Sequence, residues 1–234
     1  MFAKVSSAIL TILLFLGLIR APLPVVGLTI GIMAVAATIL NVRRIGLSWP
    51  HLLLPVLYLA GFGIIFSIIS GPLLKILFLV LGSVLFYWLE INIGRESHLL
   101  QNLFLLSAFA LYVGVFAFQF YFNLNTGWVV LMVAGLTMVL ILQGFAGFSL
   151  PTKKVFALSI VLICSELAWG LSMWPTHFLV NGVVLFAAFY LLWFLSFSAF
   201  FGKLTRRKIL WHLGLISFVL IITLASANWQ PILP

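Results

Sequence analysis

Charged residues are scarce in this sequence. Only 6% of the 234 residues are charged, and the chain contains three Glu and no Asp. Soluble domains carry about 25% charged residues, so this composition leaves too little charge to solvate a globular surface. Paired carboxylates, a Gly-rich phosphate loop and a Cys/His metal motif are also missing from the sequence. We therefore expect no catalytic residues, no metal and no cofactor, and the sequence favours a non-enzymatic protein.

Cysteine is nearly absent as well. The single cysteine, Cys164, lies inside an apolar run, so an intramolecular disulfide and a cysteine-only metal cage are excluded. A thiol in such a run is typically buried and inert.

Apolar residues make up most of the chain. They account for 65% of the residues, including 23 Phe and 8 Trp, and the mean hydropathy is +1.34. A membrane-spanning helix needs about 20 predominantly apolar residues, and this chain offers nine such segments with short connections. The predicted spans are approximately 2–19, 24–42, 51–70, 72–93, 99–122, 127–148, 154–174, 177–201 and 209–228.

The fold prediction is an all-α, polytopic integral membrane helix bundle. Residues 1–234 form one transmembrane domain of successive helical hairpins, because short connections make neighbouring helices antiparallel, and there is no soluble domain. The first segment also resembles a signal-peptide core. Eight spans are therefore the alternative, with that segment cleaved or lying in the interface.

The basic residues divide unevenly between the two sides of this topology. Ten of the twelve Lys and Arg fall on the side that holds the N-terminus, and only Arg20 and Lys75 fall on the other. Basic residues concentrate in cytoplasmic loops, so the N-terminus is predicted to be cytoplasmic and the C-terminus external. This also explains the net charge of +9 without a nucleic-acid partner. We expect a multi-pass protein of the cytoplasmic membrane of a prokaryote.

Glu166 is the strongest candidate for a functional residue. It lies twelve residues after Lys154 and eight before Trp174, which places it about 18 Å and 12 Å from the two ends of a continuous helix. A carboxyl at that depth normally faces the bundle or a water-filled cavity. Ser159 and Trp169 fall on nearly the same helical face. The hypothesis is a site for a substrate, proton or cation, and the alternative is a neutral acid that joins two helices.

The turn after this span adds two candidates. His177 stands at the predicted outer interface, and Asn181 follows one helical turn later. Both could line an outward-opening pocket with Glu166. The alternative is an ordinary interfacial turn within an aromatic belt.

Two further pairs complete the candidate residues. Glu90 lies five residues before Arg95, and an ion pair of Glu90 with Arg95, Arg43 or Arg44 is a candidate cytoplasmic gate. Gly27 and Gly31 form a Gly-x-x-x-Gly pair, which permits close approach of another helix. That helix belongs either to the bundle or to a partner, namely another membrane protein or a second copy of the chain.

Two functions fit these features. The first is a small carrier or channel-like protein with an intramembrane carboxyl site. The second is a non-enzymatic scaffold or subunit of a larger membrane complex. A carrier predicts a wet cavity reaching Glu166, whereas a subunit predicts a broad exposed packing face.

Overall fold

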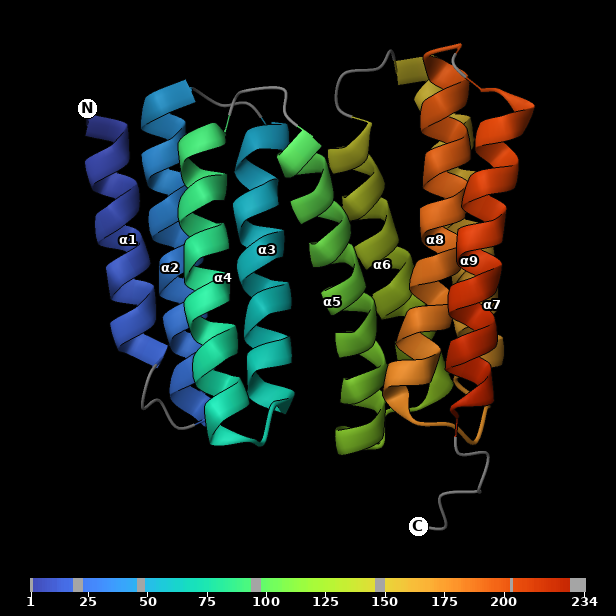
Figure 1. Ribbon diagram of the computed structural model, residues 1–234, viewed down its shortest axis with the longest axis horizontal. Coiled ribbons are helices and arrows are strands. Elements are labelled where there is room, and N and C mark those ends of the chain that lie inside the picture. Colours follow the sequence, from blue (N-terminus) through green and yellow to red (C-terminus); the bar gives the residue numbers. More distant parts are fainter. Residues whose placement is uncertain are drawn as a thin grey trace. The chain divides into compact units, whose positions relative to one another are not determined.

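The computed structural model describes residues 2–18, 23–45, 49–93, 98–145, 150–202 and 204–227. These residues form nine helices and no strand (Figure 1). The helices are α1 (Phe2–Leu18), α2 (Leu23–Ile45), α3 (Trp49–Ile68), α4 (Pro72–Asn92), α5 (His98–Phe122), α6 (Thr126–Gly144), α7 (Leu150–Leu171), α8 (Phe178–Phe200) and α9 (Arg206–Ala225). The all-α prediction is confirmed for the described residues.

Short polar or turn-forming residues mark the boundaries of several helices. Asn125 precedes α6, and its side chain accepts a hydrogen bond of 3.0 Å from the backbone N–H of Trp128. Pro72 begins α4, where its missing N–H costs nothing. Gly202 follows α8 with φ of +61°, a left-handed conformation that glycine adopts without a steric penalty.

Seven of the helices in the described part of the chain are long and apolar enough to cross a membrane. They are α2 and α4 through α9. Apolar stretches of α1 and α3 are shorter, at Val5–Leu18 and Leu52–Ile68. The structure therefore supports an integral membrane protein with seven candidate spans, whereas nine spans and the orientation stay predictions.

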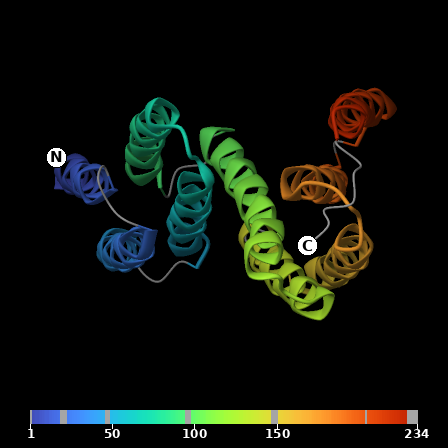
Figure 2. The ribbon, with the colours of Figure 1, turned by 90° about the horizontal axis from the view of Figure 1, so that it is seen from below.

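The chain divides into two compact units, Met1–Leu111 and Tyr112–Pro234. In the first unit α1, α2, α3 and α4 pack as a closed ring, each against the next and α4 against α1 (Figure 2). The Tyr58 hydroxyl on α3 donates a 2.7 Å hydrogen bond to the carbonyl of Gly82 on α4. The Phe62 ring fills the space that a side chain at position 82 would need. Small and aromatic residues thus lock these two helices together.

In the second unit α6, α7, α8 and α9 pack in sequence order. The second half of α5 lies against α8 at Gly182, where an added Cβ would come within 2.7 Å of the Cα of Val113. The last helix, α9, packs against α8 and leaves most of its surface exposed, with Ile216 as its one buried residue. Figure 2 shows α9 at the free end of this row of helices.

Candidate functional site

Glu166 lies on the exposed face of α7. Ser159 and Trp169 are exposed on the same face, as their spacing predicts, and Leu162 lies between them. The Ser159 hydroxyl donates to the Val155 carbonyl of its own helix at 3.0 Å. Glu166 has no hydrogen-bond or ion-pair partner among the described residues. This carboxyl therefore points out of its unit instead of into it.

The end of α7 also changes the depth of Glu166. The helix ends at Leu171 and a turn follows, so five residues separate Glu166 from the helix end. This corresponds to about 8 Å of helical rise, less than the 12 Å predicted from a continuous helix to Trp174. Glu166 lies within the span but nearer one end than expected.

Asn181 and His177 serve the turn between α7 and α8. The Asn181 side chain is buried, and its Oδ1 accepts a 2.7 Å hydrogen bond from the Thr176 hydroxyl. His177 is exposed and caps α8, with Nδ1 accepting from the backbone N–H of Leu179 at 3.4 Å. No hydrogen bond joins either residue to Glu166 in the part of the chain that the structure describes. Both side chains therefore have a structural role in this turn.

Glu90 is the carboxyl that the structure buries. Its side chain is 1% exposed, and its Oε1 accepts a 3.2 Å hydrogen bond from Nδ2 of Asn41, which is fully buried on α2. Sequence reasoning missed Asn41, although it is a polar residue inside an apolar span. Arg95, a predicted gate partner of Glu90, lies outside the described residues. The observed contact at this level is a helix-to-helix bond between α2 and α4.

A second buried polar cluster joins α5, α6 and α7. The hydroxyls of Tyr112 and Thr137 share a 2.8 Å hydrogen bond, and both side chains are fully buried. The Cys164 thiol of α7 is also fully buried and lies beside both hydroxyls. The prediction of a buried thiol is confirmed, but the cluster was missed because Tyr and Thr are common in apolar spans. Its arrangement is that of an interhelical tie.

In the part of the chain that the structure describes, open grooves run along the surfaces of α2 and α9, and neither includes Glu166. On α2, Gly27 and Gly31 are exposed, and a Cβ at either position would meet nothing within 4 Å. They line a groove of about 600 Å³ with Leu28, Ile32, Val35, Ala36 and Ile39. This small-residue face is not used for packing within its own unit. The other groove lies on α9.

Residues 6–227 match the sequence model of a family described as "Protein of unknown function (DUF5656)". The chain belongs to this family. No curated protein and no solved structure matches the chain. Within the described residues no group of three or more His, Cys, Asp or Glu is placed to hold a metal ion. The family match thus covers nearly the whole chain and assigns no function to it.

Proposed function

We propose that this family member is a non-enzymatic subunit of a larger membrane complex. The observation that carries the proposal is the outward-facing carboxyl of Glu166 within the apolar span of α7. Ionisable residues inside a membrane almost always face protein or a water-filled cavity. An outward-facing one therefore indicates that this face of α7 is covered in the assembled state.

The cost of placing a carboxyl in lipid favours a polypeptide over lipid as the cover of Glu166. Acyl chains offer no hydrogen-bond partner, and inserting an acidic residue costs about 2.5–3.5 kcal/mol at the centre of a span and less toward its ends. A neighbouring helix supplies donors and acceptors, and each interhelical hydrogen bond contributes about 0.6 kcal/mol and up to roughly 2. Ser159 and Trp169 on the same face add a hydroxyl and an indole N–H. The occupant is thus another transmembrane helix with a polar residue at the depth of Glu166.

Site-specific photo-crosslinking in intact membranes tests this proposal. A photoreactive residue at Leu162 lies on the Glu166 face, and the same residue at Leu131 of α6 is the matched control. Their exposed fractions are 61% and 63%, so lipid contact alone would treat them equally. We expect a protein adduct at Leu162 and lipid adducts only at Leu131.

Two substitutions connect that adduct to the carboxyl. Glu166→Gln keeps the volume and most of the hydrogen-bonding capacity of a neutral acid, so the protein adduct should persist. Glu166→Leu removes that capacity and should reduce its yield severalfold. Lipid adducts alone at Leu162, or an undiminished protein adduct in Glu166→Leu, would contradict the proposal.

A small carrier is the second candidate function. The observation that favours it is the buried Glu90 carboxyl, with Asn41 as its neighbour on another helix. Purified protein in vesicles that contain a pH-sensitive dye tests this candidate. A carrier that uses Glu90 should dissipate a proton gradient, and Glu90→Gln should abolish that flux while Glu166→Gln retains it. The reverse result would place the transport site at Glu166, and no flux in the wild type would remove the proton-carrier candidate.

A further inference from the structure

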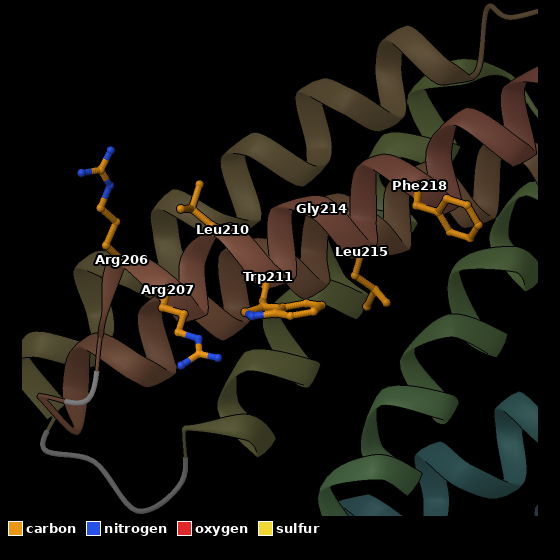
Figure 3. Close-up of a pocket in the computed structure, with 7 residues that line it drawn as sticks. All are labelled: Arg206, Arg207, Leu210, Trp211, Gly214, Leu215 and Phe218. Carbon is orange, nitrogen blue, oxygen red and sulfur yellow. The ribbon is translucent and has the colours of Figure 1, made fainter.

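The groove on α9 combines two cations with a long apolar surface. It is lined by Arg206, Arg207, Leu210, Trp211, Gly214, Leu215 and Phe218 and has a volume of about 770 Å³. Figure 3 shows Arg207, Trp211 and Leu215 in succession along one side of the helix, and Arg206 and Leu210 along the other. Gly214 presents no side chain, and a Cβ there would meet nothing within 4 Å. The groove is therefore charged at one end and apolar, with an open notch, along the rest.

The charge at this end of the second unit is one-sided. Lys153 and Lys154 lie near the start of α7, and Arg206, Arg207 and Lys208 begin α9. Both helices run antiparallel to α8, so these residues lie at the same end of the unit. The one acidic side chain in this half of the sequence is Glu166, which lies about 18 Å along α7 from Lys154. No carboxylate side chain of this unit is thus near enough to neutralise these cations. Their electrostatic complement is an anion.

The length of the groove matches one leaflet of a bilayer. Arg206 and Phe218 are separated by twelve residues, or about 18 Å of helical rise, and half of the hydrocarbon core is about 15 Å thick. Trp211 is 70% exposed one turn beyond the arginines, the level at which indoles favour the membrane interface. The cations therefore fall at headgroup depth and the apolar part at acyl-chain depth.

We propose that this groove binds an anionic phospholipid, with its phosphate at the arginine end and an acyl chain across the notch at Gly214. Guanidinium groups bind phosphate oxygens through paired, charge-assisted hydrogen bonds. Basic pockets beside transmembrane helices recognise anionic headgroups in the same way. The proposal is independent of the contact proposed for α7, because it uses a different helix face.

Native mass spectrometry of the purified full chain tests the headgroup. The protein is equilibrated in detergent with equal amounts of phosphatidylglycerol and phosphatidylcholine, and retained lipid is counted. We expect the wild type to retain phosphatidylglycerol preferentially. Since each basic residue near the surface contributes about fivefold, the double variant Arg206→Gln/Arg207→Gln should lose roughly thirtyfold of that preference. Lys153→Gln/Lys154→Gln removes the same charge from the same end outside the groove and should lose less than fivefold.

A second variant tests the acyl chain. Gly214→Leu fills the notch without changing charge, and the open space around Gly214 lets the variant fold. It should reduce phosphatidylglycerol retention severalfold, whereas Gly135→Leu, at an equally open position on α6, should leave it unchanged. Glycerol phosphate, which has the headgroup chemistry but no acyl chain, should not displace the lipid at equal concentration. Equal retention of both lipids, equal losses in the two charge variants, or no effect of Gly214→Leu would overturn the proposal.

Discussion

Replacing Gly182 with Ala should destabilise the second unit, and the size of the effect follows from the contact geometry. The new Cβ would lie 2.7 Å from the Cα and Cγ2 of Val113 and 3.0 Å from its backbone nitrogen. Backbone atoms of α5 cannot move away as a flexible side chain does, so α5 and α8 must separate. Overpacking of this kind costs about 1–3 kcal/mol. A contact this close to backbone atoms belongs in the upper half of that range, about 2–3 kcal/mol. Alanine recovers about 1 kcal/mol through its higher helix propensity, which leaves a net loss of roughly 1–2 kcal/mol.

Gly135→Ala is the matched control for this substitution. Nothing lies within 4 Å of a Cβ at position 135, so the propensity gain should act alone and stabilise the protein by about 0.5–1 kcal/mol. Unfolding of the purified protein in mixed micelles by increasing SDS, followed by circular dichroism, measures both free energies. The two variants should change stability in opposite directions. A Gly182→Ala protein as stable as the wild type would show that α5 and α8 do not approach this closely.

Three further predictions concern topology, the buried cluster and the thiol. A reporter fused after Pro234 should read as external, and one within Lys203–Lys208 should read as cytoplasmic, because ten of the twelve basic residues lie on the predicted cytoplasmic side. A cytoplasmic C-terminus would favour the eight-span alternative. Thr137→Val should cost about 0.6–2 kcal/mol of unfolding free energy in the SDS titration, because it removes the hydroxyl bonded to Tyr112. The same change at Thr38, whose hydroxyl bonds to its own helix, should cost less, and equal losses would refute an interhelical role. Cys164 is fully buried, so a maleimide should label it only after SDS unfolding, and rapid labelling of the native protein would contradict that burial.

The predicted spans agree with the helices to within a few residues at most boundaries, because helix length in a membrane is set by its thickness. The difference at the end of α7 has a clear physical reason. Apolar residues continue to Trp174, but the residue before a proline is disfavoured in the α-helical region, and Pro175 follows. The backbone N–H of Trp174 instead bonds to the Leu171 carbonyl at 3.0 Å, as in a turn. Hydropathy alone therefore extended the helix by three residues.

The face that each span buries was not predictable from hydropathy. In a soluble bundle the apolar stripe identifies the core, but in a membrane the lipid-facing side is as apolar as the interior. Glu90 stood close to a predicted span end and suggested a group at headgroup level, yet it is 1% exposed. Glu166 stood deep within a span and suggested an interior group, yet it is exposed. Depth can be read from sequence position, whereas burial depends on helix rotation, which only the packing reveals.

The outward position of Glu166 contrasts with the polar contacts inside the two units. Glu90 reaches Asn41 on another helix, and Tyr112 reaches Thr137, so several polar groups inside the units are satisfied by a neighbouring helix of the same unit. Glu166 has no such partner among the described residues. A carboxyl exposed there lowers the stability of the isolated chain in lipid, because no hydrogen bond offsets its cost of insertion. Glu166→Leu should therefore stabilise the isolated chain and weaken its assembly with a partner. A residue that holds its own bundle together would instead lower the stability of the isolated chain when it is replaced.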